Sequence, residues 1–269
     1  MRPSLTFTFR GREHASREGP LRWADMSEPP VRTVDRMAAG LVHLYTSIGV
    51  VLALLMVHFS YAGDITKVLW LFLLAMLVDG TDGFLARYFD VKRVMPGFDG
   101  ALLDNIVDYI TYAFAPMVLL WSTGYLPKGW LGGVVASIPL LASCYQFCRS
   151  DAKTDDNLFL GFPSYWNIAA FYLIVLDANA MVTTASLLLL TVLVFVPISY
   201  VYPSRTETAW QLTMALTVAW LGLYAVLLFQ YPDVSWWAIA LSVVYAAYYV
   251  GLSLKLTLAR RAGLRVSPS

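Results

Sequence analysis

The sequence predicts an all-α, polytopic membrane protein with about eight transmembrane helices. Hydrophobic residues make up 58% of its 269 residues, and charged residues only 14%. A soluble domain keeps roughly 25–35% charged residues on its surface, so this composition excludes an ordinary soluble protein. The charged residues gather in short segments between long apolar runs, as in loops that join membrane helices. The net charge of +1 comes from basic residues spread over many loops, which predicts no nucleic-acid partner.

The chain divides into one membrane domain and two tails. Residues 1–36 contain seven arginines and no apolar run long enough for a signal peptide, so we expect a mobile, cytosolic tail. Residues 37–260 form a single transmembrane domain, because long apolar segments recur through this range without interruption. Residues 261–269 form a second, basic cytosolic tail.

Eight apolar segments are close to the 17–25 residues that a helix needs to cross a bilayer. The fifth is the shortest. Their expected ranges are 38–60, 66–87, 101–125, 129–149, 162–177, 180–202, 208–230 and 235–258.

The loop charges predict the orientation of these segments. With eight spans, alternate loops and the C-terminal tail lie on the same side of the membrane as the N-terminal tail. This side contains most of the basic residues that follow the first span: Lys92, Arg93, Arg149, Lys153, Arg205, Arg260, Arg261 and Arg265. The opposite loops contain Asp64, Asp177 and Asp233, and only two basic residues, Lys67 and Lys128. Basic loops stay in the cytoplasm, so both termini are expected to be cytosolic.

Carboxylates occur in the second and third apolar segments at spacings that place them on one face of each helix. On the second helix, one face at its cytoplasmic end carries Asp79, Asp82, Gly83 and Ala86, which are spaced i, i+3, i+4 and i+7. On the third, the cytoplasmic start carries Gly100, Asp104 and Asp108, spaced i, i+4 and i+8. The short loop between the two helices lets these faces meet. The sequence therefore predicts four carboxylates around one cavity.

Four neighbouring carboxylates repel one another unless cations hold them. Oxygen ligands favour hard ions, so we expect two Mn²⁺ or Mg²⁺ ions and no zinc. A two-metal carboxylate site suits phosphoryl transfer. Asp104 taken alone would be interpreted as a helix cap. The whole set, with Arg87 beside it to pair with a phosphate, favours a functional site instead.

The complete pattern D-x2-D-G-x2-A-R followed by G-x3-D-x3-D resembles the signature of the CDP-alcohol phosphotransferases. It spans thirty residues, from Asp79 to Asp108, and the overall resemblance covers roughly residues 38–260. The twelve residues between Arg87 and Gly100 replace the usual eight, a gap characteristic of the bacterial phosphatidylcholine synthase branch. The eight-span layout and the segment from Gly161 to Asn167 also resemble that branch.

The resemblance implies a role for each matching residue. Asp79, Asp82 and Asp104 would bind metal, and Asp108 would bind metal or act as the general base. The residues expected to bind the nucleotide or donor are Thr46, Gly83, Ala86, Arg87 and Gly100. The resemblance also implies an enzyme in the bacterial inner membrane, with its active site at the cytoplasmic face and a homodimer as one expected partner.

For the substrates, the resemblance implies CDP-diacylglycerol as donor and choline as acceptor, with phosphatidylcholine and CMP as products. A quaternary ammonium binds aromatic faces, and we name Tyr112, Tyr165 and Trp166 as candidates. An interfacial aromatic belt would also place aromatic residues here.

Two alternatives remain open. A transferase of the same family could use serine, inositol or glycerol 3-phosphate, and a cation transporter would also carry acidic residues in membrane helices.

Overall fold

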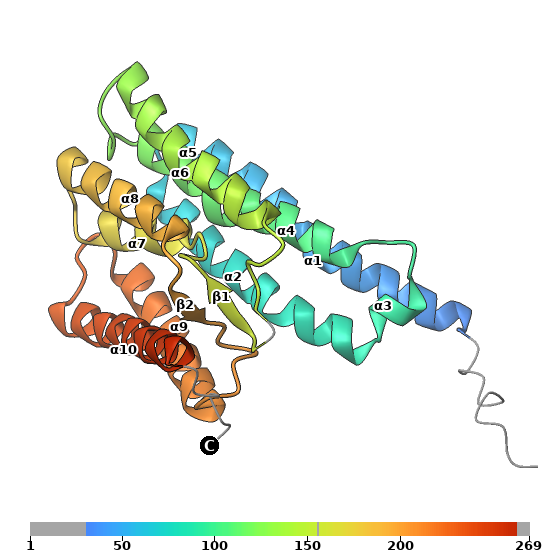
Figure 1. The fold of residues 1–269 in the computed structure, drawn as a ribbon. Helices are drawn as coiled ribbons and strands as arrows, with labels where there is room; N and C mark the ends of the chain where they lie inside the picture. Colours follow the sequence, from blue (N-terminus) through green and yellow to red (C-terminus); the bar gives the residue numbers. More distant parts are fainter. Residues whose placement is uncertain (1–30, 155, 263–269) are drawn as a thin grey trace, which may run out of the picture.

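The computed structural model describes residues 31–154 and 156–262. Helices dominate this part of the chain (Figure 1). The helices are α1 Thr33–Tyr61, α2 Ile65–Tyr88, α3 Val91–Val94, α4 Gly100–Asp108, the π-helix Tyr109–Phe114, α5 Ala115–Ser122, α6 Trp130–Cys148, α7 Trp166–Val175, α8 Ala180–Phe195, α9 Trp210–Gln230 and α10 Trp236–Arg261. Two short strands, β1 Leu158–Leu160 and β2 Ser199–Val201, complete the described elements.

The first helix begins earlier than the sequence predicted. Helix α1 starts at Thr33, so the end of the expected tail, residues 33–36, already belongs to the helix. The Asp35 carboxylate accepts hydrogen bonds from the backbone N–H of Arg32 at 3.0 Å and from its guanidinium, and these bonds hold the start of the helix. The rest of the N-terminal tail, residues 1–30, and the C-terminal residues 263–269 lie outside the described residues.

All eight expected segments contain a helix, and the prediction of an all-α, multi-pass membrane protein is confirmed. In the described part of the chain, six helices are long and apolar enough to cross a membrane. The fifth and sixth segments are shorter than predicted: α7 has 10 residues and α8 has 16. At 1.5 Å per residue they reach about 15 Å and 24 Å, against about 30 Å for the hydrocarbon core.

A small antiparallel sheet that the sequence did not reveal takes up the end of the sixth expected segment and lies shortly before the fifth. Leu158 pairs with Val201 and Leu160 with Ser199, so the residues next to α7 and α8 become extended. Helix α10 covers this sheet, because Ser253 and Thr257 accept hydrogen bonds from the backbone N–H groups of β2. In Figure 1 the sheet lies at the centre of the molecule, between the α9–α10 pair and the other helices.

A π-helix interrupts the third span immediately after Asp108. The N–H of Ala115 donates to the carbonyl of Ile110, five residues earlier. Pro116 follows at the start of α5 and has no N–H to continue the α-helical ladder. Single π turns of this kind often occur at functional sites.

The helices alternate in direction, so one end of the bundle collects the residues of the motif. The end of α2, the start of α4, the end of α6 and the start of α7 all lie at this end, as do the end of α8 and the sheet. This order agrees with eight antiparallel segments and places α1's start and α10's end on the same side (Figure 1).

Candidate active site

Three of the predicted carboxylates meet at the motif end of the bundle. One oxygen from each of Asp79, Asp104 and Asp108 lies within 4.8 Å of the other two. Asp79 comes from α2, whereas Asp104 and Asp108 are one turn apart on α4. The structure therefore brings the two halves of the motif together as the sequence predicted.

The fourth carboxylate, Asp82, faces the same space from one turn further along α2. It is 7% exposed, and its Oδ2 accepts a hydrogen bond of 2.8 Å from the hydroxyl of Thr46 on α1. All four aspartates line a small cavity of about 10 Å³, which is roughly the room that one bound water or ion requires. Thr46 reaches a carboxylate of the motif here, where the sequence suggested a contact with the nucleotide.

Asp104 does not cap its helix. The N-cap of α4 is Asp99, whose side chain accepts from the N–H of Leu102 at 3.0 Å. The capping interpretation of Asp104 is therefore wrong, and its side chain is available to the cavity.

A larger cavity of about 270 Å³ opens beside the carboxylates. Asp79, Asp104 and Asp108 line one part of it, and aromatic rings line another. Five rings contribute: Phe147, and the four that form a connected aromatic wall, Tyr112, Phe159, Tyr165 and Tyr202. The cavity thus combines negative charge with aromatic surface.

The rings of this wall touch one another. Phe159 stacks on Tyr202 with centroids 4.5 Å apart and meets the edge of Tyr165 at 6.4 Å. Tyr165 lies 6.1 Å from Tyr112. Burial raises the pKa of Tyr202 to about 12, so this ring stays neutral at physiological pH. The sequence missed Phe159, because no pattern identified the strand that carries it.

Trp166 does not reach the cavity. Its side chain is fully buried, and its Nε1 donates a 2.7 Å hydrogen bond to the hydroxyl of Ser143 on α6. Of the three aromatic residues that the sequence proposed for choline, the structure brings only Tyr112 and Tyr165 to the cavity.

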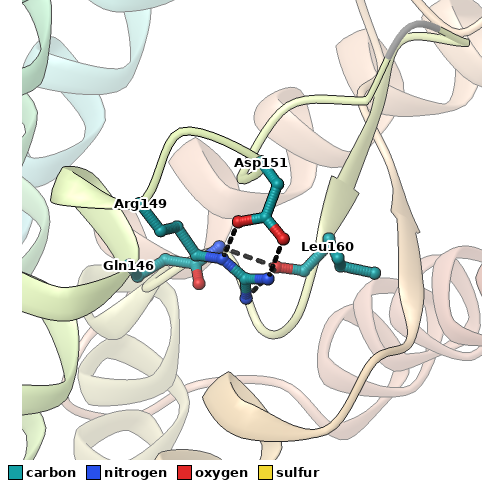
Figure 2. Close-up of polar contacts among 4 residues, drawn as sticks. All are labelled: Gln146, Arg149, Asp151 and Leu160. Carbon is teal, nitrogen blue, oxygen red and sulfur yellow. Dashed lines mark hydrogen bonds and ion pairs between the residues drawn. The ribbon is translucent and has the colours of Figure 1, made fainter.

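The loop after α6 contributes Arg149, Ser150, Ala152 and Lys153 to the lining of the cavity. Figure 2 shows the polar contacts that hold this loop. Arg149 makes two hydrogen bonds of 2.7 Å to Asp151 and a longer one, 3.4 Å, to the carbonyl of Leu160. Gln146 donates to the same carbonyl at 3.0 Å. Arg149 lowers the pKa of the Asp151 carboxyl through these hydrogen bonds. The Arg149 guanidinium therefore stabilises the loop through these hydrogen bonds.

Lys153 extends from this anchored loop toward the carboxylates. Its Nζ lies 4.0 Å from Oδ2 of Asp104, and its side chain lines the larger cavity. A backbone bridge between Lys153 and Phe159 holds the loop beside β1. The site thus includes one lysine ammonium group next to the acidic cluster.

Glycines allow the helices that carry the aspartates to approach closely. A Cβ at Gly100 would lie 2.8 Å from Cε1 of His43 on α1. A Cβ at Gly49 would lie 2.3 Å from Cγ1 of Val107 on α4, a contact that the motif did not reveal.

The other expected donor residues lie along the outer end of α2. A Cβ at Gly83 would lie 3.4 Å from the Arg87 guanidinium, and Arg87 lies over the ring of Phe84 at 4.7 Å. Ala86 packs against the small apolar cluster formed by Ala39, Val42, Val91 and Val94. None of these three lines the larger cavity.

Comparison with known proteins identifies the family. No family model matches the chain. A phosphatidylcholine synthase from Legionella pneumophila is 39% identical over 84% of this chain and 91% of its own length. The chain belongs to the phosphatidylcholine synthase family. A member from Pseudomonas aeruginosa is 36% identical over 82% of this chain, and one from Borreliella burgdorferi is 32% identical over 84%.

Membership of the phosphatidylcholine synthase family confirms the predicted enzyme class and the family that the motif indicated. The carboxylate cluster of this family member can hold a metal ion, because it offers only hard oxygen ligands at close spacing. The four aspartates fit such an ion by chemistry and by position, since all line one ion-sized cavity.

Proposed function

We propose that this protein transfers the phosphatidyl group of CDP-diacylglycerol to choline, releasing CMP, at the cytoplasmic face of the bacterial inner membrane. The observation that carries the proposal is the convergence of the four motif aspartates on one site. Asp79, Asp104 and Asp108 come from two helices and meet beside a cavity with aromatic walls. The family relationship supports the choice of phosphatidylcholine as the product.

In the proposed reaction, the choline hydroxyl oxygen attacks the phosphorus that bears the lipid. A new P–O bond forms to choline, the P–O bond to CMP breaks, and CMP leaves as an anion. Asp108 would accept the hydroxyl proton as a general base, as the resemblance to the family implies. Its position supports this role, because Asp108 lines both the ion-sized cavity and the larger one, as Asp79 and Asp104 also do.

Two Mg²⁺ or Mn²⁺ ions held by Asp79, Asp82, Asp104 and Asp108 would neutralise the diphosphate and the charge that develops on CMP. Thr46 holds Asp82 through its hydroxyl, so we assign it to the carboxylates and not to the nucleotide. Gly83, Ala86, Arg87 and Gly100 remain the expected neighbours of the cytidine diphosphate.

Lys153 is well placed for the donor phosphates. Its ammonium lies beside Asp104, whereas Arg149 already binds Asp151. A phosphate that entered next to Asp104 would lie beside this lysine. We therefore assign donor binding to Lys153 and a structural role to Arg149.

The aromatic wall suits choline. A trimethylammonium group cannot donate a hydrogen bond, and it binds aromatic faces at about 0.5–2 kcal/mol each. Tyr112, Phe159, Tyr165 and Tyr202 line the same cavity as three carboxylates, which attract the positive charge. Serine and glycerol 3-phosphate each carry an anionic group that these carboxylates would repel. Inositol has no cationic group for the rings.

A transporter is the second class of function. The complete transferase signature and the relatives favour the enzyme, since a transporter needs no such signature.

A headgroup competition tests the proposal. Purified protein receives CDP-diacylglycerol with radiolabelled choline, serine, inositol or glycerol 3-phosphate. We expect choline to be incorporated far faster than the other three. Equal incorporation of serine or glycerol 3-phosphate would contradict the choline assignment and leave the transferase class. No product with any alcohol would contradict both.

A further inference from the structure

We propose that the hydroxyl of Tyr112 is a positioning group for the metal-binding carboxylate of Asp79. The inference rests on the metal-binding role proposed above. Tyr112 lies outside the sequence motif, four residues after Asp108. Its assignment comes from geometry alone.

The contact is short and buried. The Tyr112 hydroxyl donates to Oδ2 of Asp79 at 2.8 Å, and the Tyr112 side chain is only 6% exposed. A carboxylate has two oxygens, so one hydrogen bond leaves the second oxygen available to the cluster with Asp104 and Asp108. The bond therefore fixes the rotation of the Asp79 carboxylate without removing it as a ligand.

The π-helix supports this arrangement. Tyr112 belongs to the π-helix Tyr109–Phe114, and Pro116 cannot supply the N–H of a regular helix here. Asp108 immediately precedes the π-helix, so the same helix supplies one ligand and the group that orients another. Contacts of this kind around a metal commonly set ligand orientation and affinity.

Thr46 makes the equivalent contact with the other α2 carboxylate. Its hydroxyl donates to Oδ2 of Asp82 at 2.8 Å and is also buried. Each aspartate of α2 therefore receives a hydroxyl from a different neighbouring helix. This repetition favours a positioning role over a chance contact.

The ring and the hydroxyl of Tyr112 can be tested separately. Tyr112→Phe removes the donor to Asp79 but keeps an aromatic face on the choline cavity. A loss of metal affinity with an unchanged KM for choline would assign the effect to the hydroxyl. A merely structural role would change both quantities or neither.

The matched control is Tyr109→Phe in the same π-helix. The Tyr109 hydroxyl donates to the carbonyl of Leu140 at 3.4 Å, contacts Cys144 and does not line the larger cavity. The chemical change is identical, but no carboxylate loses a partner.

The experiment measures Mn²⁺ binding to full-length purified protein in lipid nanodiscs, using the paramagnetic resonance signal of free Mn²⁺. We expect the Kd for Mn²⁺ to rise roughly tenfold in Tyr112→Phe, at the lower end of the effect of such contacts, and to stay within twofold in Tyr109→Phe. The KM for choline at saturating Mn²⁺ should stay near that of the wild type.

Unchanged Mn²⁺ affinity in Tyr112→Phe would overturn the inference while leaving the proposed reaction intact. A wild-type protein that binds no Mn²⁺ would overturn the metal role as well. If Tyr112→Phe does not fold, Thr46→Val provides the same test on Asp82. Its control is Ser47→Ala, which loses only a bond to the backbone of α1. A Kd that rises in Thr46→Val but not in Ser47→Ala would support the positioning of the α2 carboxylates by neighbouring hydroxyls. An unchanged Kd would remove the repeated arrangement from which the role of Tyr112 is argued.

Discussion

Gly49 tests whether helix packing sets the geometry of the carboxylates. An alanine Cβ at this position would lie 2.3 Å from Cγ1 of Val107, where ordinary contact begins at 3.4 Å, so the two helices are about 1.1 Å too close for it. Val107 lies on α4 between Asp104 and Asp108. Any movement that makes room for the methyl group therefore moves two of the aspartates.

The expected size of the effect follows from this distance. Valine in a helix strongly prefers one side-chain rotamer, so α4 must give way rather than Val107. A displacement of about 1 Å in a catalytic group can lower the rate roughly 100-fold. Overpacking should lower the free energy of unfolding by about 1–3 kcal/mol. The higher helix propensity of alanine than of glycine should offset about 1 kcal/mol of this loss. We expect Gly49→Ala to fold and to lose most of its kcat.

Two further variants make the test specific. Gly40→Ala on the same helix has no atom within 4 Å of the new Cβ and should keep wild-type activity. Val107→Ala in the Gly49→Ala background removes the clashing methyl groups and should restore much of the rate. Phosphatidylcholine formation and the midpoint of heat-induced aggregation would be measured for all four proteins. Wild-type kcat in Gly49→Ala would refute the reasoning.

Four other predictions concern the reaction and the topology. Chelation should abolish activity, and Mn²⁺ or Mg²⁺ should restore it; full CMP release in chelator would exclude the metal role. Asp108→Asn should abolish turnover while a donor-binding assay remains near wild type, and a near-native rate would exclude it as the base. Tyr165→Leu should raise the KM for choline about two- to thirtyfold with little change in the donor KM, whereas Tyr61→Leu, at an exposed position, serves as the unaffected control. Topology reporters fused at Asp64 and Asp233 should show that both positions lie outside the cytoplasm. A reporter that shows either position in the cytoplasm would contradict the eight-segment topology.

The cluster of aspartates could be predicted because its charged residues lie within or beside apolar segments. Carboxylates in apolar helices are costly, so Asp79 and Asp108 stood out, and helical spacing then placed them on facing stripes. The structure brings them together with Asp104. Gly100 also followed from the motif, but its close neighbour His43 did not.

Half of the aromatic wall, Tyr112 and Tyr165, was among the residues predicted from the sequence, but the other half depends on pairing between distant segments. Phe159 and Tyr202 meet because β1 pairs with β2. In a strand of three residues, the alternation of apolar and polar residues is too short to distinguish the strand from part of an apolar helix. The same pairing makes the end of the sixth expected segment extended, so α8 is shorter than predicted. For Trp166, interfacial position suggested a binding role, but Ser143 on another helix accepts its N–H and fixes it in the core.

The central claim is that this site joins a phosphatidyl group to choline. Its most direct test is the stoichiometry of the purified protein's products, with CMP and phosphatidylcholine quantified in the same reaction, with and without choline. We expect one CMP for each phosphatidylcholine, and almost no CMP when choline is absent. CMP release that is independent of choline, with water as the acceptor and phosphatidic acid as the lipid product, would contradict it.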